Sequence, residues 1–298
     1  MPAIPFPPDI LAAAFPDFNG FGHINSGTFK AVHRVTTPDG HEEVLKIIRL
    51  PRDGGTDEAR AFREQELGRA KRETALLAEI DSPFVVKLGM VAPSIIDLNG
   101  ESCMAYTEEM LPGRDLEAVI GDKIQPDESD IKLLLNCLVQ SIRAMWSKHK
   151  TVHRDIKPAN IFATGLIERP YVLLDFGIAY NMDEPGLTVN PLHIPHTPLY
   201  MAPEMFDANF RESLSYRADL YAAGVTAFEY ASGGTHPLAK SGDNHAKTYT
   251  RILHQEPLRL GALRPDLSRG LCSLIDQLMK KNPSLRPGNL PLILNQLQ

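Results

Sequence analysis

The feature of this sequence that most restricts its fold is a change from strand-like to helix-like patterns about a third of the way along the chain. From Phe18 to about Tyr106 it carries two β-type runs, FKAVHRV and HEEVLKIIRL, and the Pro-Asp-Gly of TTPDG between them is typical of a turn. One segment, TDEARAFREQELGRAKRETALLAEI, is rich in helix formers and ends at a Pro-containing break. This part therefore predicts a β-rich lobe with one main helix.

From about Leu116 the apolar residues follow helical spacing instead. The clearest segments are IKLLLNCLVQSIRAMWSKH, YRADLYAAGVTAFEYAS and LCSLIDQLMKK, with short strands such as YVLLDFG between the first two. The sequence contains neither internal repeats nor low-complexity linkers. We predict an α+β chain of two lobes and expect the hinge within residues 107–115.

Composition narrows the class of protein. The 298 residues suffice for one large domain or for two lobes that share a cleft. The net charge of −6 shows no excess of basic residues of the kind that binds nucleic acid, so we expect no nucleic-acid partner. The three cysteines lie far apart without metal-binding spacing, which indicates reduced thiols. The sequence shows neither a leader peptide nor a membrane segment, and we expect a cytoplasmic protein.

Two short segments carry the most reactive side chains. VHRDIKPANIF places Asp155, Lys157 and Asn160 in a loop after a helix, and LLDFGIA places Asp175 at the end of an apolar strand. Taken singly, the first is a charged turn and the second a strand exit. Together and in this order they resemble the catalytic loop and the metal-binding motif of the protein kinases.

This resemblance extends over nearly the whole chain, from about Ile24 to Arg286. It implies a bilobal protein-kinase-like fold, with a small β-rich N-lobe that has one main helix and a larger helical C-lobe. We expect an N-terminal extension over residues 1–17, the N-lobe over 18–108 and the C-lobe over 109–298, all within a single kinase domain.

The resemblance also implies a reaction, the magnesium-dependent transfer of the γ-phosphoryl group of ATP to serine or threonine hydroxyls of protein substrates. Asp155 would accept the hydroxyl proton, Lys157 would steady the γ-phosphate, and Asn160 and Asp175 would hold Mg²⁺ through hard oxygen atoms. In this family a lysine two residues after the aspartate accompanies serine/threonine specificity. Thr197 in HTPLYMAPE would bond Asp155 and Lys157.

In the predicted N-lobe, strand alternation places Val44 and Lys46 on one face of EEVLKII. The resemblance implies that Val44 covers the adenine and that Lys46 reaches the α and β phosphates. It further implies a helix glutamate paired with Lys46. We expect Glu73 in this role, because it shares a helix face with apolar residues that would pack inward. The alternatives on the same helix are Glu64, Glu66 and Glu79.

The glycine-rich loop departs from the family pattern. Anchored on Val32, the pattern G-x-G-x-x-G-x-V falls on Asn25, Gly27 and Lys30, so that only Gly27 is kept. Asn tolerates the left-handed backbone better than most residues do. Lys30 adds bulk and charge, and we expect it to adjust the affinity for the nucleotide without abolishing binding.

The strand that enters the hinge, SCMAYTEEML, allows two alignments one residue apart. Either Thr107 or Glu108 would guard the back of the adenine pocket. Backbone groups from Glu109 to Leu111 would bond the adenine, and Asp115 would contact the ribose. The residues implied to bind the nucleotide are Ile24, Asn25, Gly27, Val32, Val44, Lys46, Glu109, Leu111, Asp115 and Phe162.

Three charged residues outside these motifs also match the family. Glu204 and Arg286 match a distant acid–arginine pair, and Asp219 matches the acid that tethers the backbone of the catalytic loop. Taken singly, each would be a surface charge. Together they favour protein substrates, because kinases of small molecules commonly lack the Ala-Pro-Glu segment that contains Glu204. His153 and Phe176 match part of an apolar stack.

Further departures leave other functions open. His196 replaces the usual glycine, and His193 stands at the usual phosphorylation position. We therefore expect activity that does not depend on phosphorylation there, with Thr188 as the alternative site. Together with Asn25 and Lys30, His196 suggests an ATP-binding pseudokinase scaffold as the second hypothesis. A small-molecule kinase is the third.

Overall fold

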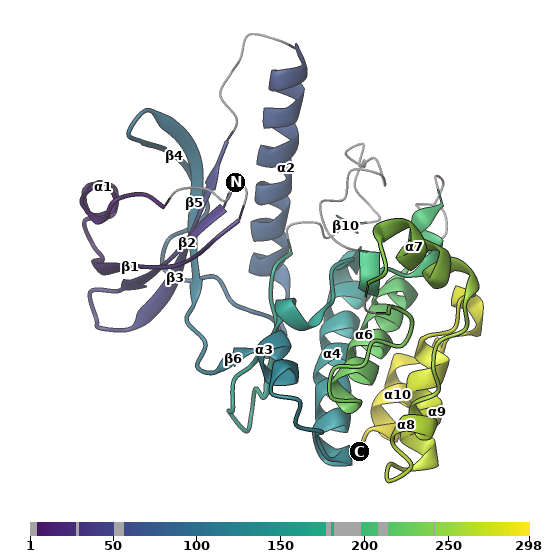
Figure 1. Cartoon of the computed structure of the whole chain (residues 1–298). Helices are drawn as coiled ribbons and strands as arrows, with labels where there is room; N and C mark the ends of the chain where they lie inside the picture. The colour runs from purple at the N-terminus through teal and green to yellow at the C-terminus, as the bar shows by residue number, and fades with distance from the viewer. Residues whose placement is uncertain are drawn as a thin grey trace. The chain divides into compact units, whose positions relative to one another are not determined.

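The computed structural model describes residues 5–27, 30–50, 57–176, 180–181, 198–207, 214–240 and 242–298. The chain divides into two compact units, Met1–Glu79 with Val86–Leu111, and Ile80–Val85 with Pro112–Gln298. The first unit holds the five-stranded sheet and the second most of the helices, so the predicted α+β class and bilobal fold are confirmed (Figure 1). Across these residues, we find no helix with the length and apolarity that a membrane span requires.

The first unit is built on an antiparallel sheet with the strand order β1-β2-β3-β5-β4. The turn predicted from Pro-Asp-Gly joins β2 to β3, where Gly40 has a φ of 88°, a conformation that glycine adopts without strain. In the central pair, Lys46 of β3 lies opposite Tyr106 of β5. The strands are β1 (Asn19–Ser26), β2 (Lys30–Thr36), β3 (Glu42–Arg49), β4 (Ser94–Leu98) and β5 (Glu101–Glu109).

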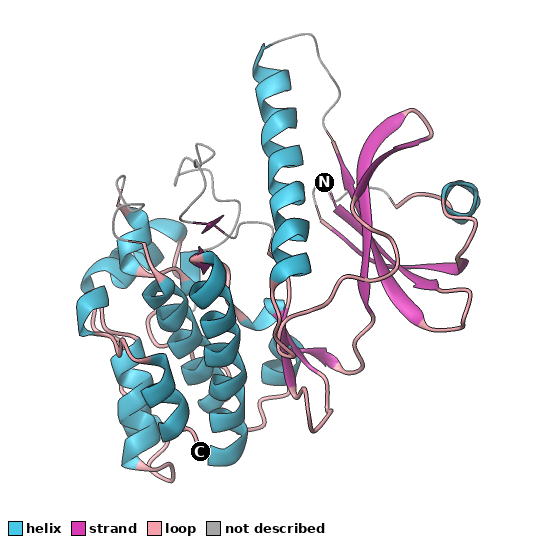
Figure 2. Ribbon diagram, turned by 180° about the vertical axis from the view of Figure 1, so that it is seen from behind, coloured by secondary structure: helices cyan, strands magenta, loops and turns pink. Residues whose placement is uncertain are grey.

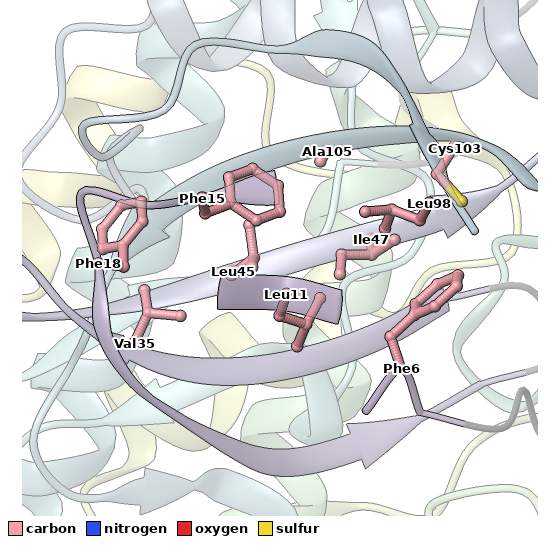
Figure 3. Close-up of a cluster of buried hydrophobic side chains, with 10 residues drawn as sticks. All are labelled: Phe6, Leu11, Phe15, Phe18, Val35, Leu45, Ile47, Leu98, Cys103 and Ala105. Atoms are coloured by element: carbon pink, nitrogen blue, oxygen red, sulfur yellow. The ribbon is translucent and has the colours of Figure 1, made fainter. Parts of the chain in front are cut away.

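The N-terminal residues cover the outer face of this sheet. They form α1 (Pro8–Ala14), whose Leu11 is fully buried. Figure 3 shows Phe6 and Phe18 at opposite ends of an apolar cluster, with Leu11 between them. The segment that the sequence marks as an extension thus contributes to the core of the first unit. The cluster consists of Phe6, Leu11, Phe15, Phe18, Val35, Leu45, Ile47, Leu98, Cys103 and Ala105.

The inner face of the sheet packs against α2 (Asp57–Glu79), the one main helix predicted for this lobe. Leu67 of α2 packs against a buried cluster of Ile48, Met104 and Tyr106. Arg63 Nη2 also donates to Ser102 Oγ at 3.1 Å. Side chains on β3 and β5 therefore alternate between α1 on one face and α2 on the other, as the period of two requires.

The second unit is organised around α6 (Tyr216–Ala231), which is buried along most of its length and packs against α4 and α9. Figure 2 shows these helices in cyan. Several begin with a side-chain cap; the carboxylate of Asp127, for example, accepts from Asp130 N at 2.9 Å at the start of α4. The other helices are α3 (Leu116–Gly121), α4 (Glu128–His149), α7 (His245–His254), α8 (Leu260–Leu263), α9 (Arg269–Leu278) and α10 (Leu290–Gln296).

Short strands and turns in the second unit position the predicted catalytic segments. The loop 153–160 runs from β7 (Thr151–Val152) through the turn η1 (Pro158–Asn160) into β8 (Ile161–Ala163). β8 pairs with β6 (Arg114–Asp115) and with β9 (Tyr171–Leu173), and Asp175 follows two residues after β9. β7 also pairs with β10 (Tyr180–Asn181). The remaining turns are η3 (Pro198–Tyr200), η4 (Pro203–Phe206) and η5 (Pro283–Leu285).

Candidate active site

The loop 153–160 gathers its charged and amide side chains around one carboxylate. Lys157 Nζ donates to both carboxylate oxygens of Asp155, at 3.0 and 2.8 Å. Asn160 Nδ2 donates to the main-chain oxygen of Asp155 at 2.9 Å and to its Oδ2 at 2.8 Å. The Asp155 side chain keeps 19% of its surface exposed. The loop therefore presents an oriented carboxylate that solvent, or a substrate hydroxyl, can reach.

A buried acid of α6 holds the backbone of this loop. Asp219, which is fully buried, accepts from His153 N at 2.7 Å and from Arg154 N at 2.9 Å. Burial raises the pKa of Asp219 to about 7, and these two backbone bonds act in the opposite direction. Arg154 has a φ of 72°, in the left-handed region that non-glycine residues rarely occupy. The predicted tether is confirmed, and it stabilises a strained backbone next to Asp155.

His153 connects the loop to the segment that carries Asp175. Its Nδ1 accepts from Asp155 N at 3.2 Å, and its Nε2 donates to Leu174 O at 3.1 Å. This arrangement requires the neutral ring, and burial lowers the pKa of His153 accordingly. The ring also packs edge-on against Phe176, with centroids 4.6 Å apart. The resemblance of the motifs placed His153 in an apolar stack, and the hydrogen bonds of His153 become visible only in the structure.

The two predicted metal ligands lie at the ends of paired strands. Ile161 of β8 lies opposite Leu173 of β9, and Leu174 N donates to Asn160 O at 2.8 Å. Asp175 follows directly after Leu174, with a φ of 61°. Position 160 and the residue before Asp175 are thus hydrogen-bonded to each other.

The donor atoms of these two residues fit a magnesium ion. The amide nitrogen of Asn160 donates to Asp155, so its amide oxygen is the atom that carries lone pairs for a cation. An amide oxygen and a carboxylate are hard ligands, which Mg²⁺ prefers. In the described part of the chain, no group of three or more His, Cys, Asp or Glu side chains could hold a metal by itself. Asn160 and Asp175 therefore suit a magnesium ion whose other coordination positions are filled by phosphate and water oxygens.

In the first unit, Lys46 is held by an acid that the sequence analysis did not assign to it. Lys46 Nζ donates to the carboxylate of Glu108 across the β3–β5 pair. Thr107 lies on the other face of the sheet, where its Oγ1 accepts from Val91 N at 2.9 Å. Of the two alternatives for the end of β5, Glu108 is therefore the one that shares a face with Lys46. The strand register thus shows which of the two residues shares the face of Lys46, and the role of guarding the adenine pocket stays a prediction.

The glutamate predicted to pair with Lys46 stays a prediction. The backbone of Glu73 belongs to α2, but its side chain lies outside the described residues. The same holds for the Glu66 side chain, whereas those of Glu64 and Glu79 are described and exposed.

The predicted glycine-loop residues lie on β1, on β2 and, for Gly27, directly after β1. Asn25 lies opposite Val32 in the β1–β2 pair. Gly27 N donates to Lys30 O at 2.8 Å, which starts the return of the chain into β2. Ile24 is 47% exposed, and the Asn25 side chain accepts from Ser26 N at 2.7 Å. An exposed apolar side chain at this place suits contact with a flat ring, and the contact of Ile24 with the nucleotide stays a prediction.

Residues predicted to bind the rest of the nucleotide lie in both units. Glu109 closes β5, where its carboxylate accepts from Lys87 N at 2.9 Å, and Leu111 is buried. In the second unit, Asp115 lies opposite Phe162 in the β6–β8 pair. The Asp115 carboxylate caps α3 by accepting from Ala118 N at 2.7 Å. This cap engages one carboxylate oxygen, so a ribose contact would use the other.

The substrate side is described only in part. Thr197, and the positions His193, His196 and Thr188, lie outside the described residues. The distal pair predicted for this region is present, since Arg286 donates to both carboxylate oxygens of Glu204.

Comparison with known proteins places these features in a family. Residues 18–296 match the protein kinase domain. The chain is 29% identical to human ribosomal protein S6 kinase alpha-1 over 91% of its length, and 32% identical to the serine/threonine-protein kinase pkn2 of Myxococcus xanthus over 74%. It is also 32% identical to the dual specificity mitogen-activated protein kinase kinase mek-1 of Caenorhabditis elegans over 50%. These matches cover 33%, 25% and 40% of the respective relatives, so the chain spans less than half of each.

Proposed function

Because this chain belongs to the protein kinase family, we propose that it transfers the γ-phosphoryl group of ATP to serine and threonine hydroxyls of protein substrates in a magnesium-dependent reaction. The observation that carries the proposal is the cluster of Asp155, Lys157 and Asn160, hydrogen-bonded through His153 and Leu174 to the segment that bears Asp175. These residue types are the ones that kinase chemistry uses, and the backbone just before Asp155 is held by Asp219 of α6.

Each residue would have a distinct part in the reaction. The Asp155 carboxylate would accept a hydrogen bond from the substrate hydroxyl and take its proton as the oxygen attacks the γ-phosphorus, while the bond from phosphorus to the bridging oxygen breaks and ADP leaves. Lys157, already bonded to Asp155, would offer its remaining N–H to a γ-phosphate oxygen. Asn160 and Asp175 would hold Mg²⁺, which supplies charge neutralisation at the β and γ phosphates. Lys46 would bind the α and β phosphates.

Serine/threonine specificity is the finer part of the proposal. It rests on Lys157 and on relatives named as serine/threonine kinases, whereas mek-1 is named as a dual-specificity kinase. The pseudokinase hypothesis is not favoured, because Lys46, Asp155, Asn160 and Asp175 are all present. We also propose a cytoplasmic location, which is supported by three buried cysteines without disulfide bonds.

A transfer assay with γ-labelled ATP tests the proposal. We would supply magnesium and a generic protein substrate, and identify the phosphorylated amino acids after acid hydrolysis. Asp155→Asn is expected to lower kcat by at least about a hundredfold while ATP binding persists. Asp276→Asn, in α9 of the same unit, is the matched control and should retain activity. Wild-type protein that binds ATP but transfers no phosphate would support the pseudokinase, and label on tyrosine would contradict the specificity.

A further inference from the structure

The central strands β3 and β5 carry two cross-strand ion pairs, one on each face of the sheet. On the outer face, Arg49 Nε donates to Glu101 Oε2 at 2.7 Å, and the two side chains are 21% and 37% exposed. On the inner face, the side chains of Lys46 and Glu108 are only 8% and 5% exposed. Of these two pairs, the inner one is therefore the one removed from water.

The register of the sheet determines the inner pair. Lys46 lies opposite Tyr106, and Glu108 is two residues further along β5 on the same face. Diagonal neighbours of this kind are close enough for long side chains to meet. Because both residues belong to the central strands, the position of the carboxylate depends on the sheet itself rather than on a loop or on α2.

The surroundings strengthen this interaction. Ile48, Met104 and Tyr106 form a buried cluster on the same face, and Lys46 Nζ lies 5.7 Å from the centre of the Tyr106 ring. Opposite charges attract more strongly away from water, and a buried charge is retained only when it is well paired. The Glu108 carboxylate therefore restricts the directions in which the Lys46 ammonium group can point.

We infer that Glu108 is a positioning residue, a carboxylate within the sheet that orients Lys46 for the ATP phosphates in addition to any acid supplied by α2. The inference rests on the proposed function, which gives Lys46 its contact with the α and β phosphates. An ammonium group has three N–H donors, so a bond to Glu108 does not by itself exclude bonds to phosphate oxygens. Glu108 then favours nucleotide binding instead of competing with it.

The test compares two isosteric changes on the same strand. Glu108→Gln removes the charge of the buried acid, and Glu101→Gln does the same at the partly exposed pair on the opposite face. We would measure the Kd of a fluorescent ATP analogue, the KM for ATP, the KM for the protein substrate and kcat. Glu108→Gln is expected to raise the Kd and the KM for ATP about tenfold and to leave the KM for the protein substrate unchanged. Glu101→Gln should change each value less than twofold.

A second comparison shows whether Glu108 acts through Lys46. In a Lys46→Met background, Glu108→Gln should not weaken ATP binding further, because the group that it orients is gone. If Glu108→Gln does not fold, Glu108→Met replaces it with the same expectations, since methionine is apolar and similar in volume.

The outcomes separate this inference from the proposed function. Wild-type protein that fails to bind ATP would overturn both. Wild-type binding together with an unchanged or lower Kd in Glu108→Gln would overturn the role of Glu108 alone; a lower Kd would show that the carboxylate withholds Lys46 from the phosphates. A lower unfolding midpoint with an unchanged KM for ATP would show a purely structural role.

Discussion

Arg286 donates through both terminal nitrogens to the Glu204 carboxylate, at 2.6 and 2.7 Å, and the Arg286 side chain is completely buried. Its three remaining N–H groups donate to the carbonyl oxygens of Lys280, Lys281 and Arg217. All five donors of the guanidinium are therefore satisfied. The pair joins the turn at Glu204 to the C-terminal part of the second unit.

This geometry predicts that lysine cannot replace Arg286. A lysine supplies three donors from a single point and would leave buried acceptors without partners. Arg286→Lys should lower the free energy of unfolding by about 3 kcal/mol, measured from urea denaturation. The control is Arg259→Lys, because the Arg259 side chain pairs with Asp276 but is 70% exposed; this change should alter the free energy of unfolding by less than about 0.5 kcal/mol. Equal effects of the two substitutions would contradict the prediction.

The tether from Asp219 predicts a combined loss of stability and activity. In Asp219→Asn, one of the two backbone N–H groups at positions 153 and 154 faces an amide nitrogen instead of an oxygen. A buried donor without an acceptor costs about 1–3 kcal/mol, which urea denaturation would measure. We also expect a lower kcat at saturating ATP, because the strained loop then no longer holds Asp155 in place. Wild-type kcat in a destabilised variant would show that the tether has no part in positioning Asp155.

Burial of His236 in its neutral form should make the free energy of unfolding depend on pH. Its Nδ1 accepts from Leu238 N at 3.1 Å and from Ala239 N at 2.8 Å, and its Nε2 bonds Leu199 O at 3.2 Å. Burial lowers the pKa of His236 from 6.5 to about 4. The stability that neutral His236 contributes is fully present above pH 6.5. It is lost as the pH falls toward 4, because in this range the unfolded chain binds a proton at position 236 that the folded protein does not yet bind.

Comparison with His236→Gln isolates this effect. Between pH 7 and pH 4, the wild type should lose about 2–3 kcal/mol more stability than the variant, because each unit of pKa shift corresponds to about 1.4 kcal/mol. Urea denaturation at a series of pH values measures the difference. A constant difference across this range would show that His236 keeps an ordinary pKa in the folded protein.

The packing of α1 predicts that the N-terminal segment stabilises the first unit. Leu11 is fully buried in the cluster on the outer face of the sheet (Figure 3). Leu11→Ala should lower the free energy of unfolding by about 3 kcal/mol through lost burial and the cavity left behind. Ala13→Ser, at an exposed position of the same helix, should have little effect. Equal stability of the two variants would show that α1 contributes nothing to the core.

Much of the architecture could be predicted because its patterns are local. Alternation in EEVLKII separates Lys46 from Leu45 and Ile47, and these two do lie on the outer face. Helical spacing after Leu116 marks the second unit. The short spacing within VHRDIKPANIF also places Asp155, Lys157 and Asn160 in one loop, and the fold of that loop brings their side chains into contact.

The features that escaped prediction depend on contacts between distant segments. The run Thr107-Glu108-Glu109 has no alternation of polarity, so its face became clear only from the pairing of β5 with β3. The N-terminal MPAIPFPPDILAAAF is interrupted by prolines and gives no clear period, although Phe6 and Leu11 are buried in one cluster with residues of distant strands, such as Leu98 of β4. The bond from His153 to Leu174 likewise joins segments that no local pattern relates.

The placement of α1 bears on how fragments of this protein should be designed. The match to the kinase domain begins at residue 18, but Phe6, Leu11 and Phe15 precede it. A fragment trimmed to that boundary would leave Val35, Leu45 and Ile47 facing water, and such apolar surfaces promote aggregation. Recombinant versions should therefore begin no later than residue 5, so that the sheet keeps its cover.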